Sequence, residues 1–376
     1  MKSQAASPTK LIIERCNQGE PIVSPTAQWW ETGVTFNAAA LYLERSPVND
    51  AIIQRLLPDY SLDDPDLAEG VVAIHYRARP ETEPGFVRSF IGLAVFTPAF
   101  KLLYRAPQPV LSSDPDPHGL DPLGVEDPRI TRIGDVFYMV YCGVTPDPVH
   151  TWHAALCLAQ SSDLLHWEKL GALRGEINPT NNKDGVLFPD PIEGKYYLLH
   201  RPFWSGLPQN DFAMHLAVSD APGGVWKNCG EVLHSFYNPR WRMSWVGCGS
   251  VPIAMGNGRY AEIYHTGNSS SATDREYDLD VAVFDFDAFD PQQPASIVTA
   301  RLEHLMTPEA PAELRSDSAL MVSNTLFACG SYEYQDYIYI IYGGADTYTL
   351  AARVKKLALF EALHSASLKN PFLDED

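Results

Sequence analysis

Short segments rich in aromatic and β-branched residues recur along the chain at intervals of roughly 50–60 residues, the spacing of a repeat architecture. They are VVAIHYRAR (71–79), VFYMVYCG (136–143), KYYLLHRP (195–202), RYAEIYHTG (259–267) and IYIIYGGAD (338–346). In four of them the apolar run ends in Tyr, and in the third His200 takes that position. This composition predicts that each segment is a β-strand.

Turn-forming pairs precede each of these strands, and another short apolar run lies before each turn. The pairs are Glu69-Gly70, Gly134-Asp135, Glu193-Gly194, Asn257-Gly258 and Gln335-Asp336. Such pairs favour tight hairpins. A third element follows the strand, most clearly in 158–171 and 216–230, where Trp167 and Trp226 are each followed by Gly four positions later.

Three or four antiparallel strands repeated five times predict an all-β protein, a five-bladed β-propeller. Helical periodicity is confined to KKLALFEALHSAS near the end of the chain, which predicts a short C-terminal helical appendage, and to part of a polar insertion at 45–68. We expect one propeller domain over 1–376, with an N-terminal arm (1–30) and a C-terminal tail (356–376). Trp167 and Trp226 recur with the blades, so we expect them between blades.

The composition of the chain argues against several classes of function. The net charge of −19 disfavours nucleic acid as a partner. The first residues contain no apolar signal region, and no apolar run is long enough for a membrane span, so we expect a cytoplasmic protein without a membrane partner. The six cysteines form no CxxC pair, which indicates free thiols and gives no sign of a metal site or a cofactor.

In a propeller the innermost strand of each blade starts beside a central channel. By position these starts are Asn37, Asp127, Asp184, Ser250 and Asn324. Charged and polar groups occur in blade register near them: Arg77 and Arg79, Glu126 and Arg129, Lys183, His200 and Arg201, Tyr264 and His265, and Asp346. Each alone is compatible with a solvated strand end, but five blades would bring them to one axis. A pocket that mixes carboxylates with Lys, Arg and His can bind a polyol together with an anion.

Four sequence blocks, in order, resemble glycoside hydrolase family 130, the β-mannoside phosphorylases and β-mannosidases. They are GVEDPRI (124–130), KDGVLFPDPIEGKYYLLHRP (183–202), EIYHTG (262–267) and YGGADT (342–347), and Phe36-Asn37 also fits the first blade of that family. The resemblance covers about residues 30–355 and implies a propeller enzyme that inverts the anomeric centre.

The resemblance also implies roles for individual residues. Asp127 would be the general acid, acting through the 3-hydroxyl of the sugar. The substrate-binding set would be Asn37, Arg77, Glu126, Arg129, Asp184, Tyr264, His265 and Asp346, with Tyr264 and His265 as pocket wall. Inorganic phosphate, the co-substrate of the phosphorylases, would be bound by Lys183, His200 and Arg201.

The chain departs from the family pattern in blade two. Phosphorylases usually add arginines there, but this chain has no Arg between Arg132 and Arg174 and carries His150 and His153 instead. Three alternatives stay open: phosphorolysis of β-mannosides to mannose 1-phosphate, hydrolysis by a β-mannosidase, and a carbohydrate-binding propeller without turnover, which Asp127 argues against. A hydrolase needs a carboxylate base, and the candidates are Glu262, for which we favour a structural role, Asp211 and Glu276.

The four sequence blocks do not identify the residues that would bind the acceptor sugar. Tryptophans in loops are candidates for stacking on an oligosaccharide or other mannoside: Trp29, Trp30, Trp204 and Trp241. The linkage, the acceptor sugar and the oligomeric state, including a homo-oligomer, stay open.

Overall fold

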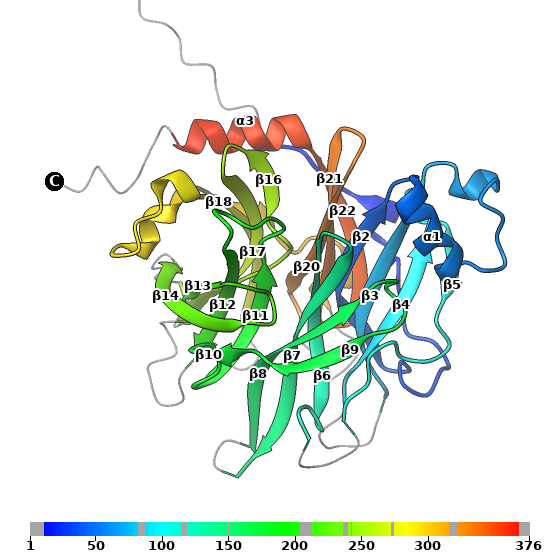
Figure 1. Cartoon of the computed structure of the whole chain (residues 1–376), viewed down its shortest axis with the longest axis horizontal. Coiled ribbons are helices and arrows are strands. Elements are labelled where there is room, and N and C mark those ends of the chain that lie inside the picture. Colours follow the sequence, from blue (N-terminus) through cyan, green and yellow to red (C-terminus); the bar gives the residue numbers. More distant parts are fainter. Residues whose placement is uncertain are drawn as a thin grey trace, which may run out of the picture.

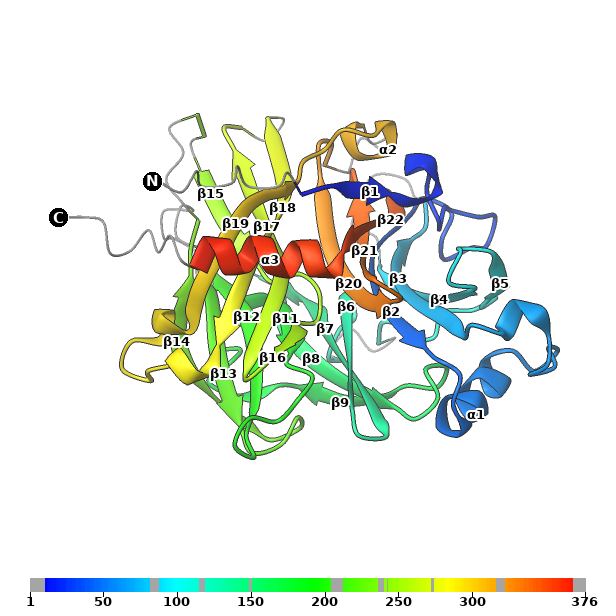
Figure 2. The same cartoon turned by 90° about the horizontal axis from the view of Figure 1, so that it is seen from above.

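The computed structural model describes residues 11–81, 88–114, 119–148, 151–203, 212–235, 240–241, 243–271, 274–315 and 322–367. Its strands form five sheets around a common axis, which confirms the five-bladed propeller (Figures 1 and 2). Neighbouring strands are antiparallel except for β10 and β14.

Each blade is one sheet. Blade one contains β2 (Val34–Leu43), β3 (Val71–Arg79), β4 (Phe90–Phe96) and β5 (Leu102–Arg105). Blade two contains β6 (Gly124–Ile133), β7 (Val136–Asp147), β8 (Thr151–Ser161) and β9 (Glu168–Ala172). Blade three contains β10 (Arg174–Gly175), β11 (Asn181–Leu187), β12 (Tyr196–Phe203), β13 (Met214–Ser219) and β14 (Val225–Leu233). Blade four contains β15 (Met243–Gly247), β16 (Ile253–Gly256), β17 (Arg259–Ser269), β18 (Arg275–Asp285) and β19 (Val298–Met306).

Blade five joins the two ends of the described chain. Its strands β20 (Leu326–Tyr334), β21 (Tyr337–Gly344) and β22 (Tyr348–Lys355) come from the C-terminal part, and β1 (Ile13–Arg15) adds an outermost strand antiparallel to β22. Part of the predicted N-terminal arm is therefore a strand that closes the ring.

Helices lie outside the blades. They are α1 (Pro47–Leu56), α2 (Pro311–Leu314), α3 (Lys356–Ser367) and the 3-10 turns η1 (Cys16–Gly19), η2 (Pro65–Leu67), η3 (Phe286–Ala288) and η4 (Pro294–Ile297). The hydroxyl of Ser46 caps α1 by accepting from the Asn49 amide. Leu359 and Leu363 anchor α3, the predicted C-terminal helix, in the core of blades four and five. Within the described ranges, no helix is both long and apolar enough to cross a membrane.

The tyrosines that recur in the second strand of the blades lie in the core. In blades one, two and five each hydroxyl donates to a carboxylate that also pairs with a cation. The three trios are Tyr76–Glu31–Arg105, Tyr141–Asp121–Lys169 and Tyr342–Glu313–Arg15. A buried hydroxyl and a buried carboxylate are thus each provided with a partner. The repeated Tyr is a structural signature of the blade.

The two repeated tryptophans also pack between blades, as expected. Trp226 is fully buried in the core shared by blades two and three. Trp167 packs against the core of blades one and two, with its ring edge-on to His75 at 5.5 Å between centroids.

Candidate active site

Three innermost strands bulge at equivalent places near the propeller axis. The register of β2, β6 and β11 shifts at Asn37, Asp127 and Asp184, whose φ angles are 45°, 51° and 59°. This left-handed backbone is unfavourable for most residues, and Asn and Asp tolerate it best after Gly. A bulge re-aims a side chain, and here it brings one polar side chain from each of the three blades to the axis.

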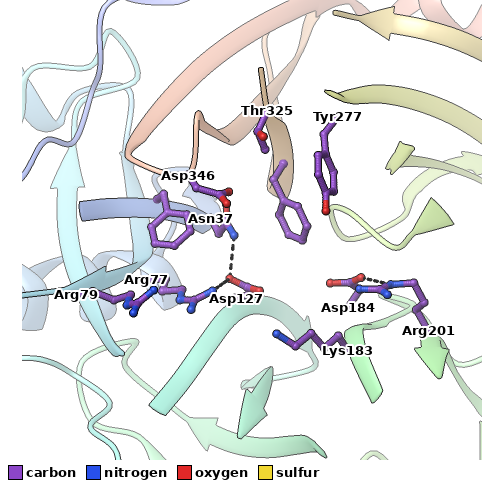
Figure 3. A pocket seen from close by; sticks show the side chains of 12 residues that line it. Asn37, Arg77, Arg79, Asp127, Lys183, Asp184, Arg201, Tyr277, Thr325 and Asp346 are labelled. Carbon is purple, nitrogen blue, oxygen red and sulfur yellow. Dashed lines mark hydrogen bonds and ion pairs between the residues drawn. The ribbon is translucent and has the colours of Figure 1, made fainter. Parts of the chain in front are cut away.

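These side chains line a cavity of about 210 Å³ to which all five blades contribute (Figure 3). The lining residues are Phe36, Asn37, Arg77, Arg79, Asp127, Lys183, Asp184, Arg201, Tyr277, Thr325, Phe327 and Asp346. Seven of the residues chosen from the sequence are among them: Asn37, Arg77, Asp127, Lys183, Asp184, Arg201 and Asp346.

Asp127 has one oxygen held by the protein and one left for a ligand. Its Oδ1 accepts hydrogen bonds from Nδ2 of Asn37 at 2.9 Å and Nη1 of Arg77 at 3.1 Å. Its Oδ2 accepts none from any described residue, and the side chain lines the cavity while only 5% of the residue is exposed. The carboxyl group is therefore oriented by blade one and directed at the cavity.

Glu126 is shared between two cations. Arg77 pairs with its Oε1, and Nζ of Lys183 donates to its Oε2 at 3.1 Å. Burial alone would raise the pKa of Glu126, but the charges of Arg77 and Lys183 lower it to about 2. Glu126 is thus a permanent carboxylate at neutral pH and orients the two cations, without lining the cavity itself.

Arg129 is fully buried and is not among the residues that line the cavity. Its Nη2 donates to the carbonyl of Cys248 at 2.8 Å, its Nε to that of Gly249 at 3.1 Å, and its Nη1 to that of Asp127 at 3.1 Å. The carboxylate of Asp184 lies 3.5 Å from Nη2. Because these bonds use most of its donors and burial is almost complete, Arg129 braces blades two, three and four, and the structure does not bring it to the cavity as a substrate contact.

Asp184 pairs with the guanidinium of Arg201, whose Nε donates to its Oδ2 at 2.7 Å. Burial opposes ionisation of Asp184, yet Arg201 and its other neighbours hold its pKa well below the usual range. Nε2 of His265 lies 3.6 Å from the same oxygen, but this ring is fully buried and does not line the cavity. Burial lowers the pKa of His265 to about 3, so the ring is neutral, and neither of its nitrogens has a hydrogen-bond partner among the described residues.

Two further predicted residues point away from the cavity. His200 is fully buried and its Nδ1 lies 2.9 Å from Nδ2 of Asn182. Tyr264 is buried in the core of blades three and four. Side chains alternate across a strand, so the neighbour of each points to the other face: Arg201 lines the cavity and His265 approaches Asp184. Neither His200 nor Tyr264 is among the residues that line the cavity, so their predicted phosphate contact and wall position stay predictions.

Five lining residues had been assigned no binding role: Phe36, Arg79, Tyr277, Thr325 and Phe327; of these, Arg79 had been expected near the axis from its blade register. Phe36 and Arg79 neighbour predicted residues, and alternation along β3 places Arg79 on the same face as Arg77. Tyr277 lies on the third strand of blade four, where its N–H donates to the carbonyl of Asn324 at 2.9 Å. Ser250, the predicted strand start of blade four, is buried elsewhere, and its N–H donates to Ile263.

The candidate acceptor tryptophans differ in exposure. Trp29 is 59% exposed, with its ring edge-on to Phe90 at 5.3 Å. Trp30 is fully buried and stacks on Tyr76, so it cannot contact a sugar. Trp241 is also buried. Trp204 lies outside the described residues, as do Asp211 and His150.

Glu262 and Glu276, two candidate bases, do not line the cavity. Glu262 is fully buried, and its Oε1 accepts from the amide of Gly249 at 2.9 Å. Burial raises the pKa of Glu262 well above its ordinary value, so it is a neutral group that supports the interrupted inner strand of blade four. Among the described residues, no group of three or more His, Cys, Asp or Glu side chains is placed to hold a metal ion.

A model of glycoside hydrolase family 130, described as beta-1,4-mannooligosaccharide phosphorylase, matches residues 70–363. The chain belongs to glycoside hydrolase family 130. It is 29% identical over 332 residues to a 1,2-beta-oligomannan phosphorylase of Thermoanaerobacter sp., covering 87% of this chain and 92% of the relative. It is also 29% identical over 225 residues to a beta-1,4-mannooligosaccharide phosphorylase of Ruminococcus albus, covering 59% of each.

Solved structures share the fold of this family 130 chain. A beta-1,2-mannobiose phosphorylase from Listeria innocua, in complex with beta-1,2-mannobiose, superposes with a TM-score of 0.69 at 20% identity, covering 94% of this chain and 99% of that one. Membership of family 130 makes the chain an enzyme of a group that contains both phosphorylases and hydrolases.

Proposed function

We propose that the protein is an inverting β-mannoside phosphorylase, which cleaves a β-mannoside with inorganic phosphate to give mannose 1-phosphate. One observation carries this proposal: the free oxygen of Asp127 faces the same cavity as Lys183, Arg201 and Arg79. The cavity thus combines a carboxyl group that can supply a proton with cations that can hold a second, anionic reactant.

In this reaction Asp127 acts as the acid. Its Oδ1 is fixed by Asn37 and Arg77, so the proton is transferred from Oδ2. The proton reaches the glycosidic oxygen through the 3-hydroxyl of the mannosyl unit, as the family resemblance implies. The bond from the anomeric carbon to that oxygen breaks, the shortened sugar leaves with the proton, and a phosphate oxygen bonds to the anomeric carbon from the opposite face.

Phosphate requires donors and not a strong base. Among the described residues, Nζ of Lys183 makes one hydrogen bond, to Glu126, and it lies 5.0 Å from the Trp152 ring centroid. An ammonium group has three donors, so two are left for a ligand. Arg201 bonds to Asp184 through Nε, and its terminal nitrogens donate to no described residue, so they are available to a ligand.

Hydrolysis is the second candidate, because blade two lacks the arginines that its phosphorylase relatives are expected to use. Water as the nucleophile requires a carboxylate base. Glu262 is sealed in the protein, and Glu276 does not line the cavity. Asp346 does line it, and burial raises its pKa to about 6. Asp346 is thus the base that the described residues offer to a hydrolase.

The deciding experiment incubates the protein with β-1,2- and β-1,4-mannobiose, with and without inorganic phosphate. We expect mannose 1-phosphate, detected by phosphorus NMR, to form only with phosphate and with inverted configuration. Free mannose released at the same rate without phosphate would reject phosphorolysis in favour of hydrolysis. The matched control is the Asp127→Asn variant, which should release neither product.

A further inference from the structure

We propose that Arg79 binds the phosphate nucleophile at the edge of the cavity between blades one and two. This inference rests on the proposed phosphorolysis. It assigns phosphate binding to a residue outside the four sequence blocks that resemble the family.

Arg79 is a cavity-lining cation whose side chain has no hydrogen-bond or ion-pair partner among the described residues. Its Nε is buried and has no hydrogen-bond partner, and no carboxylate of the described residues lies within ion-pair distance of it. Arg77 is two residues earlier on the same face of β3 and differs sharply, because its donors are used by Glu126, Asp127 and Ser89. Figure 3 shows the two arginines side by side at one edge, opposite Arg201 and Asp184.

The carboxylates at this edge are already occupied. Glu126 uses Oε1 for Arg77 and Oε2 for Lys183, and Asp127 uses Oδ1 for Arg77 and Asn37. Arg77 and Lys183 therefore take the ion pairs of these two carboxylates, and Arg79 has none; Asp346 acts on Arg79 through its charge alone. Burial and the charge of Arg77 lower the pKa of Arg79 to about 10, as expected for a cation whose charge is poorly compensated.

Phosphate suits the unpaired guanidinium of Arg79 better than a sugar does. Sugar hydroxyls are neutral and would leave the charge of Arg79 uncompensated, whereas phosphate would neutralise it and accept two parallel hydrogen bonds from the guanidinium. The sequence supports the same occupant, because the stretch between Arg132 and Arg174 contains no arginine for this task. Arg79 would supply, from blade one, a bidentate contact that blade two lacks.

The test compares Arg79→Gln and Arg79→Lys with wild type. Arg132→Gln is the matched control, because Arg132 bonds to Gly134 and Asn49 near the other end of β6. Inorganic phosphate is titrated calorimetrically into each protein, and initial rates are measured at varied phosphate and varied mannobiose. We expect Arg79→Gln to raise the phosphate Kd and KM by about tenfold or more. Its mannobiose KM should stay within about twofold of wild type, because the variant keeps the sugar contacts.

Each outcome separates this inference from the proposed function. An unchanged phosphate KM in a folded Arg79→Gln variant that still performs phosphorolysis overturns the role of Arg79 and leaves the proposed function intact. A raised mannobiose KM alone assigns Arg79 to the sugar, which also overturns the inference. Wild-type protein that hydrolyses mannobiose and binds no phosphate rejects both.

Folding is checked by thermal melting. Arg79→Lys keeps the charge but loses the guanidinium fork, so its phosphate KM should lie between those of wild type and Arg79→Gln. If Arg79→Gln does not fold, a phosphate KM of Arg79→Lys equal to that of wild type overturns the inference. Arg132→Gln should bind phosphate like wild type.

Discussion

Asn37 of blade one donates from Nδ2 to Oδ1 of Asp127 in blade two over 2.9 Å, and both residues stand in left-handed backbone at strand bulges. Two locally strained strands thus meet at a single hydrogen bond on the propeller axis. Backbone strain of this kind is maintained where the surroundings determine one conformation. The bond fixes which oxygen of Asp127 faces the substrate.

Replacement of Asp127 by Asn should abolish turnover while the fold is kept. Asn tolerates a φ of 51°, so the bulge is preserved, but an amide cannot supply the proton. We expect kcat to fall by about 10³-fold or more. Product release with mannobiose and phosphate measures this, and the melting temperature serves as the folding control. A variant with substantial residual activity would exclude Asp127 as the acid.

Asn37→Gly isolates the hydrogen bond to Asp127, because glycine adopts the left-handed backbone without strain. Loss of a hydrogen bond to a charged group costs about 1.5–3 kcal/mol, so kcat should fall by roughly 10–100-fold. The control is Asn257→Gly, a change at a turn residue whose φ is also positive, 53°. Equal kcat values for the two variants would show that Asn37 does not orient the acid.

Asp346 should make stability depend on pH. Burial raises the pKa of Asp346 from 3.8 to about 6. The positive charge of Arg77 opposes this rise, and the negative charge of Asp127 adds to it. The folded state therefore binds the proton more tightly than the unfolded chain, and this stabilisation is complete below pH ~4 and lost as the pH rises through ~6. Denaturant unfolding of wild type and Asp346→Asn at pH 4 to 7 measures it. Between pH 4 and 7 the stability difference between the two should shift by about 2–3 kcal/mol in favour of the variant. A constant difference across this range would show that Asp346 does not titrate there.

Lys183→Met should weaken phosphate binding and not sugar binding. Its ammonium lies at the cavity with donors free, so we expect the phosphate KM to rise by about tenfold or more and the mannoside KM to change little. Initial rates at varied phosphate give the answer. Lys195→Met is a suitable control, because Lys195 pairs with Asp220 on an exposed hairpin. An unaltered phosphate KM for Lys183→Met would remove Lys183 from the anion site.

The propeller and half of the site were predictable from the chain itself. Strand composition and turn pairs recur with each blade because every blade buries equivalent strand positions in its core. The Tyr76 and Tyr342 trios are an example, since each tyrosine hydroxyl donates to a buried carboxylate. Asn37, Asp127 and Asp184 were found because each stands at the start of an innermost strand and belongs to a residue type that tolerates the bulge.

The failures have a geometric cause. Adjacent residues on a strand point to opposite faces, so identifying a strand end does not decide whether His200 or Arg201 reaches the axis. Tyr277 was not predicted because it lies on the third strand of its blade, and its backbone N–H pairs with Asn324, 47 positions later by the residue numbers (324 minus 277). Such long-range pairing leaves no local pattern.

Because β1 pairs with β22, the fifth sheet can be completed only after both strands have been synthesised. During translation β1 emerges from the ribosome long before β22 exists, so its backbone groups have no partner until β22 has been synthesised. Contacts this remote slow folding. Removal of β1 would expose β22 as an open edge, a template on which further chains can polymerise.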